Sequence, residues 1–222
     1  MKKKTLTIAI ALVLVVALAV GATWAYLTAT AGPVTNTFTA GKAVAQGDLK
    51  LYEHLAKQNT DGTYSLDKTA DTVTSNTYTV MPGVNLPKDP TVEVTEANGP
   101  YYLFVEVTKG DQVGNNDTTK ALNYTVDSSH WVALKIEGKE VYAYSTDGTN
   151  PAILSKELTP TQILAPTADA TDAADNTITV SGDETLTGAL TAETAKLTFT
   201  AYACQSAGFK TAAEAFTACF SK

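Results

Sequence analysis

Few residues of this 222-residue chain could take part in catalysis or bind a metal. It has two histidines, His54 and His130, which stand in different segments and never in the HExxH spacing of a zinc protease. The nucleophile motif GxSxG and the glycine-rich loops that bind nucleotides are also absent. We therefore expect a protein that is not an enzyme and that has no catalytic residues, metal site or cofactor.

Two polar loops carry oxygen atoms that could bind Ca²⁺. The first loop, residues 109–120, contains Asp111, Asn115, Asn116 and Asp117, but their spacing fits no known calcium loop. The second is the acidic run from Asp169 to Asn176. Both compositions favour solvated loops, with calcium binding as the alternative.

The N-terminus has the layout of a secretory signal peptide. A basic run, Met1 to Lys4, precedes an apolar run from Thr5 to Ala22. The small residues Thr23 and Ala25 then stand three and one positions before a possible cleavage site at Tyr26. We predict a helical signal peptide over residues 1–25 and secretion of the rest. Because the apolar stretch is also long enough to span a membrane, an uncleaved anchor with the same external domain is the alternative.

The composition predicts an exported β protein. The formal net charge is −7, and every basic residue other than histidine is a lysine. An acidic chain without arginine lacks the bidentate group that binds phosphates and guanines, which argues against nucleic acid and anionic membranes as partners. Only an uncleaved signal segment would contact a membrane. Threonine makes up about one residue in six and favours strands.

Alternating apolar residues predict a series of strands. Thr91–Thr95 and Tyr101–Thr108 are joined by a turn at Asn98-Gly99-Pro100, so we expect them to pair as a hairpin at the centre of a sheet. The second of these strands should direct four side chains into the core: Tyr101, Leu103, Val105 and Val107. Further strands are expected at 121–127, 131–136 and 140–144, with Gly138 in a tight turn, and at 195–204.

A short helix is expected at the C-terminus, over residues 211–220. Thr211 and Glu214 form a capping box, and Ala213, Phe216 and Phe220 make an apolar stripe that must pack on the sheet. Cys219 lies near that stripe, and Cys204 ends the preceding strand. A disulfide between them would close a loop of about 15 residues and contribute roughly 3 kcal/mol; two buried thiols are the alternative.

Four stretches of the chain carry a resemblance to a known family. They are GATWAYL (21–27) with VTNTFTAG (34–41), the Pro82-Gly83 turn with KDPTVEV (88–94), AYACQSAGF (201–209), and EAF (214–216). Together these stretches resemble the TasA and camelysin family. Its members are surface and biofilm-matrix proteins of Gram-positive bacteria whose precursors are cut by the signal peptidase SipW.

The resemblance implies a secreted structural subunit of extracellular fibres or biofilm matrix. Members of the family polymerise by giving an N-terminal strand to the next copy, so the donor here would be Tyr26, Leu27, Thr28, Ala29, Thr30 and Ala31. Residues 26–33 would form this donor or, alternatively, a flexible leader. Residues 34–222 would form an all-β domain, a jelly-roll-like antiparallel sandwich with the C-terminal helix. The partners would be other copies, other matrix proteins and a SipW-type signal peptidase.

Two other classes of function remain open. A monomeric adhesin or carbohydrate-binding module would use exposed loops or aromatic side chains such as Tyr142 and Tyr144. A secreted metalloprotease of the camelysin type would need a zinc site assembled from distant loops.

Overall fold

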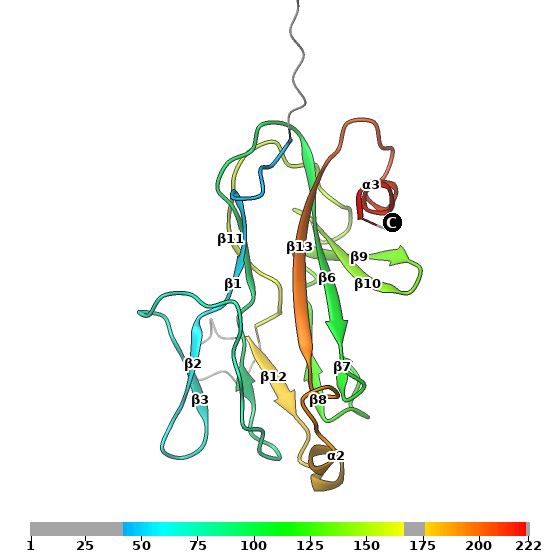
Figure 1. Cartoon of the computed structure of the whole chain (residues 1–222). Helices are drawn as coiled ribbons and strands as arrows, with labels where there is room; N and C mark the ends of the chain where they lie inside the picture. The colour runs from blue at the N-terminus through cyan, green and yellow to red at the C-terminus, as the bar shows by residue number, and fades with distance from the viewer. Residues whose placement is uncertain (1–41, 167–175, 221–222) are drawn as a thin grey trace, which may run out of the picture. The chain divides into compact units, whose positions relative to one another are not determined.

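The computed structural model describes residues 42–166 and 176–220. The predicted signal peptide (1–25), with Thr23 and Ala25, and the possible donor strand or leader (26–33) lie outside these residues. The described chain consists mostly of β-strands in antiparallel sheets and ends in a short helix, which confirms this part of the predicted fold (Figure 1).

Thirteen strands and two helices are described. The strands are β1 (Leu49–Tyr52), β2 (Leu55–Gln58), β3 (Tyr64–Asp67), β4 (Leu86–Pro87), β5 (Thr91–Val94), β6 (Tyr101–Lys109), β7 (Val113–Asn115), β8 (Leu122–Tyr124), β9 (Trp131–Ile136), β10 (Lys139–Tyr144), β11 (Leu158–Gln162), β12 (Thr177–Val180) and β13 (Leu197–Gln205). The helices are α2 (Glu184–Gly188) and α3 (Ala212–Phe220).

The longest strands form a four-stranded sheet in the order β13-β6-β10-β9. β6 pairs with β13 over nine residues, from Lys109 opposite Leu197 to Tyr101 opposite Gln205. β9 and β10 form a hairpin whose turn contains Gly138 at a φ of 69°. Glycine adopts this left-handed conformation without strain, so the predicted turn is confirmed. β13 and β9 are the two edges of the sheet.

The other strands form a three-stranded sheet, β1-β5-β11, a four-stranded sheet, β4-β12-β8-β7, and the hairpin β2-β3. Their pairings are antiparallel except for β7 with β8. The predicted hairpin of β5 with β6 is wrong, because β5 pairs with β1 and β11 whereas β6 pairs with β13 and β10. The turn at 98–100 instead carries the chain from one sheet to another, so that both strands bury apolar side chains in a shared core.

The main core collects apolar side chains from the strands of several of these sheets. Tyr101, Leu103, Val105 and Val107 enter it from β6, as predicted, and are at most 5% exposed. The hydroxyl of Tyr101 donates a hydrogen bond to the carbonyl oxygen of Lys156 (3.0 Å), and burial raises its pKa to about 12, with the nearby charge of Glu157 acting in the same direction.

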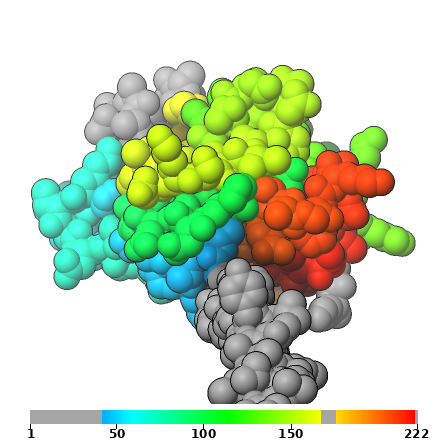
Figure 2. Space-filling model, turned by 90° about the horizontal axis from the view of Figure 1, so that it is seen from above, coloured from blue at the N-terminus to red at the C-terminus, as the bar shows by residue number. Residues whose placement is uncertain are grey.

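A second, smaller core lies between the four-stranded sheet and α3. Phe216 is fully buried there, with its ring centroid 5.3 Å from that of Phe104 in β6. Ala212 and Ala215 are buried with Phe216, whereas Ala213 of the predicted stripe is only partly buried. Figure 2 shows this C-terminal helix, in red, on one side of the molecule beside the orange atoms of β13.

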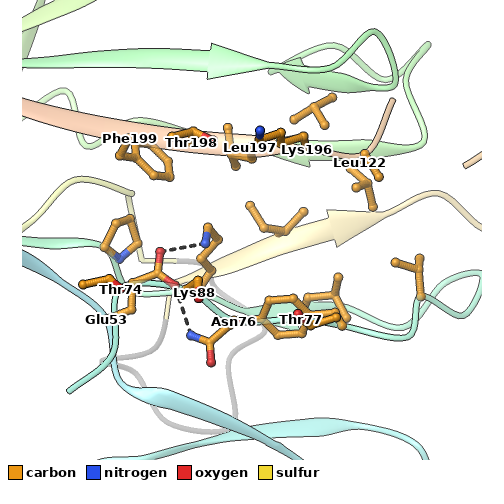
Figure 3. Close-up of a pocket in the computed structure, with 18 of the residues that line it drawn as sticks. Glu53, Thr74, Asn76, Thr77, Lys88, Leu122, Lys196, Leu197, Thr198 and Phe199 are labelled. Carbon is orange, nitrogen blue, oxygen red and sulfur yellow. Dashed lines mark hydrogen bonds and ion pairs between the residues drawn. The ribbon is translucent and has the colours of Figure 1, made fainter. Parts of the chain in front are cut away.

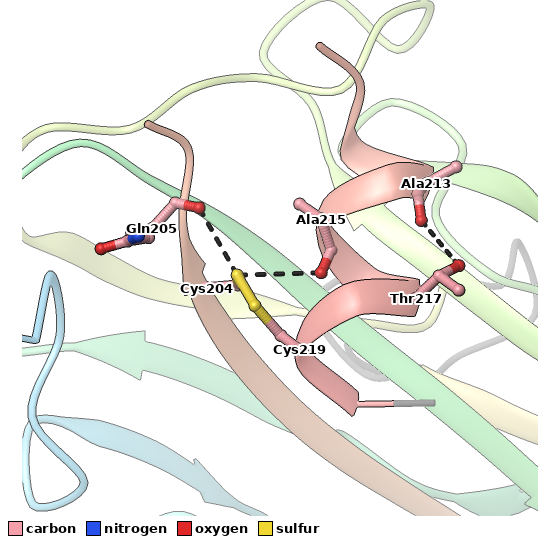
Figure 4. The surroundings of a disulfide bond; sticks show 6 residues. All are labelled: Cys204, Gln205, Ala213, Ala215, Thr217 and Cys219. Atoms are coloured by element: carbon pink, nitrogen blue, oxygen red, sulfur yellow. Dashed lines mark hydrogen bonds between the residues drawn. A yellow bond between two sulfur atoms is a disulfide. The ribbon is translucent and has the colours of Figure 1, made fainter. Parts of the chain in front are cut away.

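α3 begins after Thr211, whose Oγ1 accepts a hydrogen bond from the Glu214 amide (3.2 Å). The Glu214 carboxylate accepts from the Lys210 amide, one residue further back than in a standard capping box. Near the other end of the helix, Cys219 forms a disulfide with Cys204 of β13, with 6.6 Å between the two Cα atoms (Figure 4). The helix is therefore held to the sheet by apolar packing and by a covalent bond.

Candidate functional site

The main core is incompletely covered along β13. Leu103 and Val105 of β6 are fully buried, whereas Leu197 and Phe199 of the neighbouring β13 face the same core and are only partly buried. Leu51 of β1 is also partly buried. Apolar side chains that point inward yet stay half exposed indicate a place where the core lacks a covering element.

A groove of about 460 Å³ lies over this uncovered part of the core (Figure 3). Its apolar lining comes from several strands: Leu51, Leu86, Val113, Leu122, Ile178, Leu197 and Phe199. Residues 74–78 and Val80 line it as well. We call this space the β13 groove.

Unpaired backbone borders the groove on two sides. Within residues 42–166 and 176–220, β13 pairs only with β6, so its other edge has no strand partner. Across the groove, residues 74–80 make no backbone–backbone hydrogen bond to any described residue; the amide of Thr79 donates instead to the hydroxyl of Tyr64 (2.7 Å). Free N–H and C=O groups at a sheet edge can pair with an added strand.

One end of the groove is polar. Glu53, directly after β1, accepts hydrogen bonds from Lys88 Nζ (2.6 Å) and from Asn76 Nδ2 (3.1 Å). Tyr78 lies beside them and donates its hydroxyl to the carbonyl oxygen of Pro87 (2.6 Å). Burial raises the pKa of Tyr78, and the charge of Glu53 raises it further. The groove therefore combines an apolar floor with a charged, hydrogen-bonded end.

Each of the two histidines lies within hydrogen-bond distance of a different aspartate. His54 Nδ1 is 2.6 Å from Oδ2 of Asp89, which is 1% exposed, so His54 is anchored to the protein interior rather than merely solvated. His130 Nδ1 is 2.6 Å from Asp127 Oδ2 at the start of β9. Burial opposes ionisation of Asp127, but the hydrogen bonds from His130 and Ser129 outweigh it and lower its pKa.

The first possible calcium loop is held by internal hydrogen bonds. Oδ1 of Asp117 accepts from the amide and the hydroxyl of Thr119 (3.0 and 2.6 Å), and Asn115 Nδ2 donates to Tyr142 and Glu140. The second loop lies outside the described residues except for Asn176, which is fully buried. Residues 42–166 and 176–220 contain no group of three or more His, Cys, Asp or Glu side chains that could hold a metal ion.

The aromatic residues considered for sugar binding are buried. Tyr142 and Tyr144 are 7% and 8% exposed, and Tyr144 packs against Trp131 with a centroid separation of 5.6 Å. Their ring faces therefore belong to the core.

The predicted donor strand, Tyr26 to Ala31, lies outside the described residues. The groove that could receive such a strand was not located by the sequence patterns. The sequence holds a partial signal, because Leu51 and Leu197 each alternate with polar residues as in a strand. Nothing in the local pattern shows that both strands end a sheet on the same side of the core.

Comparison with protein-family models, with curated proteins and with solved structures finds no match to this chain. None of the helices in the described part of the chain is both long and apolar enough to cross a membrane.

Proposed function

We propose that this protein is a secreted structural subunit of extracellular fibres or biofilm matrix. In this proposal the domain is a jelly-roll-like sandwich that lacks one strand, and the β13 groove of one copy receives the N-terminal strand of the next. One observation supports it above the others: half-exposed core side chains lie beside an unpaired strand edge.

The chemistry of the groove fits an extended peptide. A strand lying beside β13 would satisfy its free N–H and C=O groups and place every second side chain over the apolar floor. As an extended strand, the segment 26–31 would place Leu27, Ala29 and Ala31 on one face and Tyr26, Thr28 and Thr30 on the other. Inserting the apolar face would remove Leu197 and Phe199 from water, which stabilises the complex by about 25 cal/mol per Å² buried.

Processing would control the assembly. Cleavage between Ala25 and Tyr26 by a SipW-type peptidase would make Tyr26 the first residue and free the donor strand outside the cell. Other copies of the chain are then the main partners, with other matrix proteins as further ones. This role needs no catalytic residue, cofactor or metal, and it accords with the resemblance to TasA and camelysin.

Electron microscopy of the mature chain, residues 26–222, tests the proposal. We expect fibres at high protein concentration and only monomers from a chain that lacks residues 26–31. A matched control replaces Thr28 by Ser, which keeps the apolar face and should keep the fibres, whereas Leu27→Asp should abolish them. Fibres that persist after the deletion, or a mature chain that stays monomeric at every concentration, would contradict the mechanism.

A further inference from the structure

Three side chains at the polar end of the groove form a partly buried chain of hydrogen bonds, which we call the Glu53 cluster. Lys88 Nζ lies 2.6 Å from Glu53 Oε1, and Asn76 Nδ2 lies 3.1 Å from Glu53 Oε2 (Figure 3). The side chains of Lys88 and Glu53 are 12% and 9% exposed. One carboxylate therefore joins an amine and a carboxamide, and the side chains of the carboxylate and the amine are largely shielded from water.

The carboxamide of Asn76 is held at both of its polar atoms. Its Oδ1 accepts a hydrogen bond from the Ala56 amide (2.8 Å), and its Nδ2 donates to the carbonyl oxygen of His54 (2.9 Å) as well as to Glu53. A backbone N–H directed at a carbonyl oxygen stabilises the negative charge that develops there when a nucleophile attacks the carbon. The surroundings of Asn76 thus favour attack at its Cγ.

The partner amine is placed to become a nucleophile. A lysine attacks only in its neutral form, so a neighbouring group must first take its proton. Nζ of Lys88 also lies 5.9 Å from the centroid of the Phe199 ring, on the apolar side of the cluster. Transfer of one proton from Lys88 to Glu53 removes two opposite buried charges and leaves a free amine beside a carboxylic acid.

From this arrangement we propose that Lys88 and Asn76 form an intramolecular isopeptide bond, with Glu53 as the proton carrier. The new bond joins Lys88 Nζ to Asn76 Cγ, and the bond from Cγ to Nδ2 breaks. Glu53 takes a proton from Nζ and delivers it to the departing nitrogen, which leaves as ammonium with the proton that Lys88 first carried. Glu53 ends as a carboxylate, and no oxidant or reductant takes part.

The Lys88 side chain must move before its Nζ can reach Cγ of Asn76. Lys88 contacts one oxygen of Glu53, and Asn76 contacts the other, so Nζ must pass along the carboxylate to reach Cγ. The four-carbon stem of lysine allows this by a change of rotamer. The bond would fix the unpaired segment 74–80 to the residue that follows β4 and so hold one wall of the groove in place.

A similar group elsewhere in the structure serves as an internal comparison. Lys109 and Asn115 also donate to one carboxylate, that of Glu140, but Lys109 and Glu140 are 31% and 25% exposed. Tyr124 and Tyr142 donate two further hydrogen bonds to Glu140, which keep this carboxylate ionised. A carboxylate held in this state is a poor acceptor for the proton of Lys109, so we expect no bond there.

The intact mass of the purified chain, unfolded and with its disulfide reduced, tests the proposal. We expect it to be lower than the mass given by its sequence by one ammonia, and tandem mass spectrometry should find a branched peptide that joins residue 88 to residue 76. Trypsin should fail to cleave after Lys88. Lys88→Arg and Glu53→Gln should restore the full mass, whereas Lys109→Arg should retain the loss. In Asn76→Asp the expected loss is one water.

Cyclisation at Asn98-Gly99 also releases ammonia, so the mass loss alone does not distinguish the two reactions. The branched peptide and the Lys88→Arg variant do distinguish them. A mass loss that survives Lys88→Arg, or a native protein whose Lys88 is cleaved by trypsin and carries no branch, would overturn the proposal. These measurements need no fibres, so they stand apart from the test of the assembly.

Discussion

Lys109 of β6 donates a hydrogen bond of 2.6 Å to Glu140 of β10, on the side of the sheet where Tyr124 and Tyr142 also donate to Glu140. Burial raises the pKa of Glu140, but these three hydrogen bonds outweigh it, so the pKa lies below its ordinary value. A carboxyl whose pKa is lowered by folding stabilises the folded state above the unfolded pKa, about 4.3, and this stabilisation is lost as the pH falls through the folded value.

We therefore predict that Glu140→Gln lowers the free energy of unfolding at pH 7 by about 1 to 3 kcal/mol. The difference between wild type and variant should shrink as the pH falls below about 4. Urea denaturation at several pH values measures both effects. The exposed Glu137→Gln serves as control and should change little; a difference for Glu140→Gln that does not depend on pH would contradict this account.

The disulfide should be a large part of the stability of the C-terminal region. Cys204 and Cys219 are separated by 15 residues, for which the chain-entropy model gives about 3 kcal/mol. For a domain of this size we expect Cys219→Ser to lower the melting temperature by roughly 6–12 °C. Alkylation of the unfolded chain should label no cysteine before reduction and both cysteines after it. Two labelled thiols without reductant would exclude the bond.

Packing under α3 gives a second stability prediction. Phe216 is fully buried against Phe104 and Tyr202, so Phe216→Ala should cost about 3–5 kcal/mol. Thr217, exposed on the same helix, provides the control, because Thr217→Ala removes no buried atoms. Chemical denaturation followed by circular dichroism measures both. Equal effects of the two substitutions would mean that α3 does not cover the sheet in solution.

The backbone at Gly110 lies close to the backbone of residues 193–194, which gives a third stability prediction. A Cβ atom on Gly110 would lie 2.2 Å from the carbonyl oxygen of Glu193 and 2.5 Å from that of Thr194. Since backbone atoms cannot move aside easily, Gly110→Ala should destabilise the protein by about 1–3 kcal/mol. Gly182 has nothing within 4 Å and is the matched control. If Gly110→Ala melts at the temperature of Gly182→Ala, the segment 193–196 does not pack as described.

Peptide binding tests the β13 groove in an experiment that does not depend on fibre growth. A synthetic peptide of residues 26–33, added to the chain that lacks those residues, should stabilise it by about 2.7 kcal/mol at 100 times the dissociation constant. A peptide with Leu27 and Ala29 replaced by Asp should have no effect. Leu197→Asp in the receiving chain should abolish the gain, because it places a charge on the apolar floor. Thermal melts at increasing peptide concentration would show these differences.

The sequence was most informative where side-chain periodicity decides the outcome. The alternation of Tyr101, Leu103, Val105 and Val107 predicted correctly that this face of β6 enters the main core, although the opposite face is also buried, under α3. Thr211 with Glu214 located the start of the C-terminal helix. These patterns are local, because the period of 2 or 3.6 residues is set by the backbone itself.

Pairing between distant segments could not be read from such patterns. Asn98-Gly99-Pro100 predicted a hairpin because turn residues between two strands usually join neighbours, yet the shared core separates β5 and β6 into different sheets. The Glu53 cluster joins residues that stand 23 and 35 positions from Glu53. Nothing in the sequence near Lys88 indicates a buried partner, so the polar end of the groove emerges only from the folded chain.

The covalent link between Cys204 and Cys219 determines how tension would enter the domain. A pull on the chain beyond α3 reaches Cys219 and passes through the sulfur bridge straight to β13, while the 14 residues between the two cysteines carry no load. β13 is bonded to β6 along nine residues, so the force would act on that whole ladder of hydrogen bonds. A helix that would otherwise unravel under small loads is thereby shielded.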